Sequence, residues 1–82
     1  MENIKTELEL FIEFRNNIAL RTIECKSSIA YWKEIFNISK KDEQERVDAL
    51  NNISLNERNL KKDKIYLKVI DTLLEEIING NN

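Results

Sequence analysis

The stretch of residues 60–77, LKKDKIYLKVIDTLLEEI, decides the fold of this chain. Apolar side chains recur in it at the two core positions of a seven-residue repeat: Leu60, Leu67, Leu74, Ile70 and Ile77. This spacing places them along one side of an α-helix, as in helical bundles and coiled coils. The stretch therefore predicts an amphipathic helix whose apolar side packs in a core.

The composition extends this prediction to the whole chain. Its 82 residues include one glycine and no proline, so almost nothing interrupts a helix from end to end. No segment alternates between apolar and polar residues as a half-buried strand does, and no hairpin-turn dipeptide is present. We therefore predict an all-α protein with a single domain over residues 1–82.

Two serine–acid pairs predict where helices begin. Ser54 and Glu57 have the spacing of a capping box, and Ser39 and Asp42 form a weaker box of the same kind. Gly80 is placed to end the last helix in the left-handed conformation. The expected fold is a three-helix bundle with long, short and medium helices at about residues 3–36, 40–51 and 55–78.

A core this small needs reinforcement, because short domains commonly depend on disulfides, metal ions or self-association. Cys25 is the only cysteine and there is no histidine, so neither an internal disulfide nor a histidine metal site is expected. We predict no metal, no other cofactor and a reducing compartment. Self-association is the remaining means of completing the core.

The first predicted helix has apolar residues on two opposite sides. Ile12, Ala19, Ile23 and Ala30 line the side opposite the main apolar stripe, and only Ser27–Ser28 hints at a kink. A helix that is apolar on both sides is buried on both sides, and two shorter helices cannot cover it. We therefore predict an antiparallel helical homodimer. Its expected interface residues are Phe11, Ile12, Ile18, Ala19, Ile23, Tyr31, Trp32 and Phe36.

Charge placement predicts how the helices are oriented. Acidic residues dominate positions 1–14, and basic residues dominate positions 57–68. In an up-down-up bundle the first and third helices run parallel, so these two regions would lie side by side. Such exposed pairs contribute at most about 1 kcal/mol each, so they would define the register more than the stability.

Several partner classes do not fit the composition. Thirteen basic and fifteen acidic residues give no general attraction to nucleic acid or to membrane surfaces. The basic run Arg58–Lys68 is interrupted by acids, which is typical of a solvated helix face. No stretch approaches the roughly 20 apolar residues of a membrane span, and no signal sequence is evident. We expect a cytoplasmic protein that binds other proteins.

Catalytic chemistry has no recognisable motif in this sequence. Cys25 lacks a histidine base and is better explained as a small core residue than as a nucleophile. A glycine-rich phosphate loop is absent, because the only glycine lies near the end of the chain. Tyr31, Trp32 and Phe36 are explained either by core or dimer packing or as an exposed binding hot spot. We therefore predict no catalytic residues.

Two arginines interrupt the apolar side of the first predicted helix. Arg15 and Arg21 occupy positions where leucine would be expected, and a buried cation needs compensation. They either pair with acids such as Asp63 or Asp71 across the bundle, or line a pocket for an anionic ligand together with Arg46. Pairing is the commoner use of such residues in helical proteins.

The second alternative has a family parallel. Arg15, Ile18, Ala19 and Lys26 resemble the Arg-x-x-Leu-Ala stretch, with a later lysine, of the all-helical chorismate mutases. The resemblance implies a long-short-medium helical dimer whose long helix carries the cations of a ligand pocket. Residues 38–44, ISKKDEQ, depart from that family's next signature at its aspartate, arginine and glutamate positions.

Two classes of function are thus in view. The first is a non-enzymatic module for protein–protein interaction, such as a small regulator, inhibitor, immunity factor or adaptor, which works through the shape of its surface. The second is a small helical enzyme or anionic-ligand binder with the chorismate-mutase-like layout. The lack of any catalytic constellation leads us to expect the first.

Overall fold

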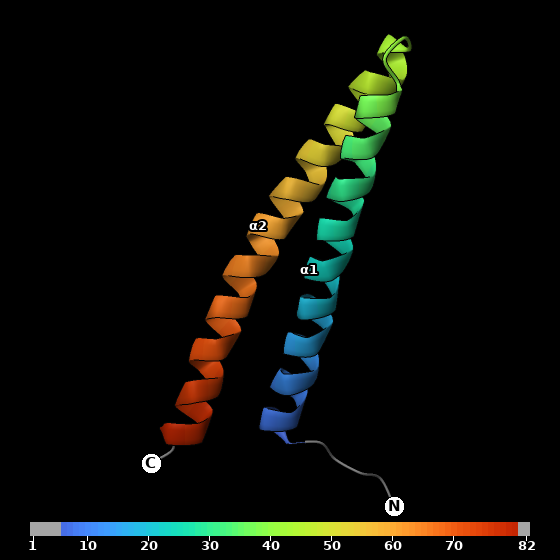
Figure 1. Cartoon of the computed structure of the whole chain (residues 1–82). Helices are drawn as coiled ribbons and strands as arrows, with labels where there is room; N and C mark the ends of the chain where they lie inside the picture. Colours follow the sequence, from blue (N-terminus) through green and yellow to red (C-terminus); the bar gives the residue numbers. More distant parts are fainter. Residues whose placement is uncertain (1–5, 81–82) are drawn as a thin grey trace, which may run out of the picture.

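The computed structural model describes residues 6–80, which form two long helices. Helix α1 spans Glu7–Ile38 and helix α2 spans Glu43–Asn79. Figure 1 shows them side by side and antiparallel, joined by a short loop at one end, with the two termini at the other. The prediction of an all-α chain is confirmed for these residues, which contain no strand.

The prediction of three helices is wrong, because α2 continues through Ser54 without a break. The physical reason is the phase of its core positions. Residues on the inner side of α2 recur at alternating intervals of three and four, from Arg46 and Ala49 through Ile53 and Asn56 to Leu60. A single helix therefore keeps one continuous stripe against α1. The predicted start of the first helix at about residue 3 lies outside the described residues.

Both helices begin at caps other than the predicted ones. Thr6 and Glu9 form a complete capping box at the start of α1: the Thr6 hydroxyl accepts from the Glu9 amide, and the Glu9 carboxylate accepts from the Thr6 amide. Asp42 caps α2 by accepting from the Glu45 amide. Ser39 is the last cap of α1 rather than the first of a helix, and its hydroxyl donates to the Glu45 carboxylate.

Gly80 ends α2, but not in the predicted conformation. Its φ is −102°, and its amide donates to the Glu76 carbonyl at 2.7 Å. A Cβ atom at this position would collide with that carbonyl oxygen, so the close approach of the chain accounts for the glycine. The last turn is therefore closed without left-handed backbone.

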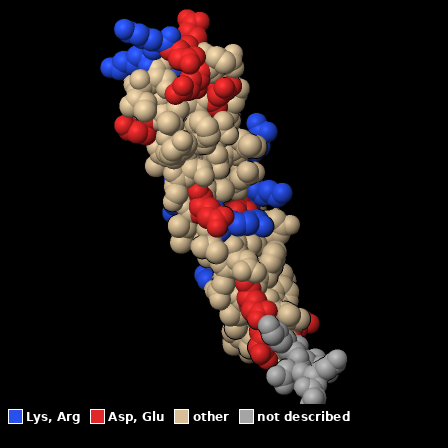
Figure 2. Space-filling model, turned by 90° about the vertical axis from the view of Figure 1, so that its right-hand side faces the viewer, with Lys and Arg blue, Asp and Glu red and all other residues tan. Residues whose placement is uncertain are grey.

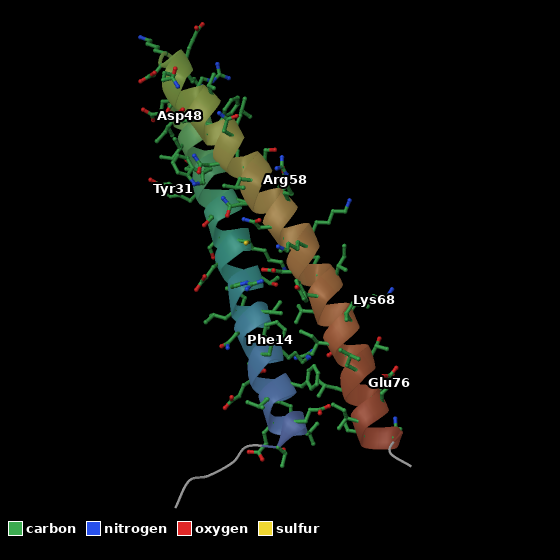
Figure 3. The ribbon with its side chains drawn as sticks, turned by 180° about the vertical axis from the view of Figure 1, so that it is seen from behind. Phe14, Tyr31, Asp48, Arg58, Lys68 and Glu76 are labelled. Carbon is green, nitrogen blue, oxygen red and sulfur yellow. The ribbon has the colours of Figure 1, made fainter. Side chains whose placement is uncertain are left out.

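Contacts along the hairpin give its register. Arg15 is bonded to Asp71, Arg21 to Asp63, and Ser39 to Glu45. Residue numbers therefore increase along α1 in the direction in which they decrease along α2. Figure 3 follows the same order, with Phe14 toward the open end of α1 and Tyr31 toward the loop. The predicted parallel placement is wrong. The acidic start of α1 lies beside the end of α2, not beside its basic stretch.

The surface buried between the two helices is small. Ile18, Ala49 and Ile70 are the only fully buried apolar residues among those described, and Thr22, Ser39 and Asp63 are the buried polar ones. Fifteen large apolar side chains in the same part of the chain remain exposed. The hairpin is a single layer, two helices wide, and its longer helix is about 55 Å long at 1.5 Å per residue. Most side chains thus have no second layer to pack against.

Neither helix of the described chain has the length and apolarity needed to cross a membrane. Helix α1 passes through Ser27–Ser28 without a break, so that pair does not interrupt it. Figure 2 looks at the hairpin from the side of α1 and shows uncharged side chains over much of its length, with charged groups densest at the loop end. Of the predicted outer stripe of α1, Ile12 and Ile23 are exposed.

Candidate interaction surface

One side of the hairpin carries both aromatic and polar side chains at seven-residue spacing. We call it the Phe14 face, and it is made by Phe14, Arg21 and Ser28 of α1 and by Asn59, Tyr66 and Leu73 of α2. Two contacts show that these rows adjoin. The Phe14 and Tyr66 rings meet edge to face with centroids 6.1 Å apart, and Arg21, Ser28 and Asn59 line one hollow.

The open end of this face is apolar on both helices. We define the open-end patch as Leu10, Phe14, Tyr66, Val69 and Leu73, which are 52%, 43%, 42%, 49% and 36% exposed. The edge-to-face rings join its α1 and α2 halves. An apolar patch that spans two helices is typical of a surface that another helix or protein covers.

The middle of the Phe14 face is polar. A shallow hollow of about 420 Å³ lies there, which we call the central hollow. Its lining comes from both helices: Arg21, Glu24, Cys25, Ser28, Asn56, Asn59, Lys62 and Asp63. Glu24 and Lys62 carry opposite charges on opposite walls. The hollow therefore separates two apolar regions of the same face.

The second apolar region lies toward the loop. Tyr31 and Ile38 follow Glu24 at seven-residue intervals, and Leu55 precedes Lys62 by the same interval, so they continue the Phe14 face. They are 58%, 66% and 51% exposed. The Tyr31 ring is held edge to face against Trp32, with centroids 5.1 Å apart. We call these three residues the loop-side cluster.

Arg15 and Arg21 are both paired across the hairpin, as the first alternative predicted. Arg15 Nε lies 2.6 Å from Asp71 Oδ1, and Arg21 Nη2 lies 2.5 Å from Asp63 Oδ1. The hydrogen bond and the charge of each carboxylate raise the pKa of its arginine above the usual value. The pairs account for both cations without a ligand.

Arg46 is not brought to the other two arginines. It lies near the loop, about 25 Å along the helix axis from the Arg21–Asp63 pair at 1.5 Å per residue. Its guanidinium stacks over the Phe36 ring at 4.3 Å, and its Nε is buried without a hydrogen-bond partner among the described residues. The three arginines therefore do not form the common anion pocket that the second alternative required.

The residues predicted for a dimer interface fall into three groups. Ile18 is fully buried inside the hairpin, so its surface is already covered within one chain. Phe11, Ala19, Trp32 and Phe36 are half-buried at or beside the contact between the helices. Ile12, Ile23 and Tyr31 are exposed and available to a partner.

The sequence prediction missed the open-end patch as a surface. Tyr66, Val69 and Leu73 flank the main stripe of α2, and in a three-helix bundle such flanking residues would pack in the core. The signal was present in the sequence, because apolar residues beside both core positions widen a stripe beyond what one neighbouring helix covers. With only α1 as a neighbour, these side chains stay exposed.

Comparisons with known proteins give no relative from which a role for this surface could be inferred. No protein-family model, curated protein or solved structure matches this chain. The long-short-medium layout implied by the chorismate mutase resemblance is absent, and Ile18 of that stretch is buried while Arg15 is paired to Asp71. Within residues 6–80, no three Cys, His, Asp or Glu side chains gather in a way that could hold a metal ion.

Proposed function

We propose that this chain is a helical module for protein–protein interaction, without catalytic activity, and that its first partner is a second copy of itself. The observation that carries the proposal is the imbalance between buried and exposed apolar residues. Within residues 6–80, one hairpin buries three apolar residues completely and leaves fifteen large ones exposed.

A folded hairpin of this kind gains little from its own core. Complete burial of a large aliphatic side chain contributes about 1.5–3 kcal/mol, whereas ordering each residue costs about 1–2 kcal/mol of backbone entropy. Antiparallel hairpins commonly resolve such a deficit by pairing into a four-helix bundle. Association would thus complete the core, and the surface that stays exposed in the dimer would be available to bind other proteins.

The anionic-ligand alternative has less support. Arg15 and Arg21 already bind carboxylates of the same chain, and Arg46 lies at the other end of the hairpin on Phe36. An anion at either paired arginine would have to displace an aspartate. A surface that binds by shape needs no such exchange.

The test is the solution mass of the full chain, measured by light scattering over a hundredfold range of concentration. We expect twice the 9.7 kDa of one chain at high concentration, and a thermal midpoint that rises with concentration. A stably folded monomer across the whole range, with a midpoint independent of concentration, would contradict self-association.

A further inference from the structure

We propose that the Phe14 face binds the Phe14 face of a second copy, with the two loops at the same end and α1 of each copy lying over α2 of the other. This inference rests on the proposed function and names its surface. Facing helices then run antiparallel, and the product is a four-helix bundle.

The area of the face matches what a dimer needs. A fully accessible large side chain offers roughly 200 Å², so exposed fractions of 36% to 52% leave on the order of 450 Å² in the open-end patch. The loop-side cluster, with 51% to 66% exposed, adds about 350 Å². Together they approach the roughly 800 Å² that each partner buries in an interface of standard size.

Charges in the central hollow favour this orientation. Glu24 and Lys62 stand on opposite walls at the same level of the hairpin. A two-fold axis parallel to the helices exchanges α1 and α2 at every level, so Glu24 of each copy faces Lys62 of the other. The same operation lays Tyr31 over Leu55 and sets the two open-end patches against each other.

The reversed orientation, with loops at opposite ends, is less favourable. Lys62 lies near the middle of α2, so the reversed pairing brings it beside Lys62 of the second copy. By the same symmetry Glu24, near the middle of α1, lies beside Glu24 of the second copy. Like charges set against each other on both helices oppose association in this orientation.

The decisive experiment mixes two charge-reversed full-length chains, Glu24→Lys and Lys62→Glu. Each variant alone sets like charges against each other twice per dimer, so its Kd should rise by about tenfold or more. In a mixed dimer of the proposed orientation, the two substituted side chains face each other with opposite charges, and so do the unchanged Lys62 and Glu24. We therefore expect the 1:1 mixture to form dimers at a concentration where each variant alone is a monomer.

Light scattering on the separate and mixed variants gives the result. Glu34→Lys and Lys61→Glu are matched controls, since both residues are exposed and lie off the Phe14 face. They should leave the wild-type mass unchanged. Pairing of Glu24 with Lys62 inside one chain predicts no effect of mixing, because each variant would keep its own repulsion.

The outcomes separate this inference from the proposed function. Weakening of each variant alone, together with recovery on mixing, supports the face and its orientation. In the reversed orientation the wild type already sets Lys62 against Lys62 and Glu24 against Glu24, so neither variant alone would be weaker than the wild type. A wild-type dimer that neither variant weakens therefore overturns the proposed orientation on this face. Weakened variants without recovery on mixing overturn the pairing of Glu24 with Lys62 between copies; the proposed function stands in both cases. A wild-type chain that is monomeric at every concentration overturns both.

Discussion

Arg21 reaches from α1 across the hairpin to Asp63 of α2, with its Nη2 atom 2.5 Å from Oδ1 and its Nε atom 3.3 Å from Oδ2. The two partners differ in environment. Asp63 is 3% exposed and occupies a core position of α2, whereas 52% of the Arg21 side chain is exposed. The two-pronged contact therefore compensates a carboxylate that the fold has removed from water.

Removal of the Arg21 guanidinium should show how far the stability of the fold depends on compensating the Asp63 carboxylate. In Arg21→Leu, Asp63 stays in the contact between the helices without a counter-charge, so the thermal midpoint should fall by on the order of 10 °C. In the double variant Arg21→Leu, Asp63→Leu, leucines fill both positions and stability should return to the wild-type value or exceed it. Thermal melts followed by circular dichroism at one fixed protein concentration measure the midpoints of the wild type and of both variants.

Arg15→Leu is the control for that prediction. Its partner Asp71 is 53% exposed, so water can solvate the carboxylate after the change, and the midpoint should move far less. Equal losses for Arg15→Leu and Arg21→Leu would mean that burial of Asp63 does not decide the effect.

The pH dependence of the Arg21 contact should be flat below strongly alkaline pH. The hydrogen bond and the charge of Asp63 raise the pKa of Arg21 above its ordinary value, and a cation with a raised pKa stabilises the fold fully at pH values below its unfolded pKa. The contribution would be lost only as pH rises through that still higher folded pKa. The stability difference between wild type and Arg21→Leu should therefore be constant from pH 7 to pH 10.

Arg21→Lys gives the contrasting case. Lysine has an ordinary pKa near 10.4, so its pairing with Asp63 should weaken as pH rises through the folded pKa of that lysine. Urea denaturation at pH 7, 9 and 11 would show the gap between wild type and this variant widening only at the highest pH. A gap of the same size at every pH would contradict charge pairing as the role of Arg21.

The arginine pairs were predictable because a cation in an apolar stripe demands an acid at a matching position on another helix, and Asp63 and Asp71 were available. The helix ends were less predictable. Ser54 and Glu57 match a capping box locally, yet a break there would interrupt a stripe that faces α1 along its whole length. The phase of that stripe outweighs one local hydrogen bond. The true box at Thr6 and Glu9 has the same spacing, so the sequence also contains the signal for the start of α1.

The same limit applies to the candidate surface. Tyr66 and Val69 are apolar residues beside the stripe of α2, and their exposure depends on how many helices surround α2. The number of helices follows from where the chain turns. The local match to a capping box at Ser54 predicts a turn there, whereas α2 continues through this residue. The error in the surface is therefore a consequence of the error in the helix ends.

Substitutions at the two boxes should separate the real cap from the false one. Thr6→Ala removes the acceptor of the Glu9 amide and should lower the free energy of unfolding by about 1 kcal/mol. Ser54→Ala lies at an exposed position inside α2, where alanine is the better helix former, and should raise it by about 0.5 kcal/mol. A loss at Ser54 as large as that at Thr6, in urea denaturation, would restore the helix boundary predicted from sequence.

A charge in the open-end patch should test the proposed interface by its apolar contacts. Val69 is 49% exposed, so Val69→Glu alters no buried position of the hairpin, yet in the proposed dimer it sets a carboxylate against an apolar patch. We expect the helical content at high concentration to persist while the dimer dissociates. Ile23→Glu is the matched control, because Ile23 is 61% exposed on the opposite apolar side of α1. If Ile23→Glu rather than Val69→Glu dissociates the dimer in light scattering, the interface is the outer stripe of α1 and not the Phe14 face.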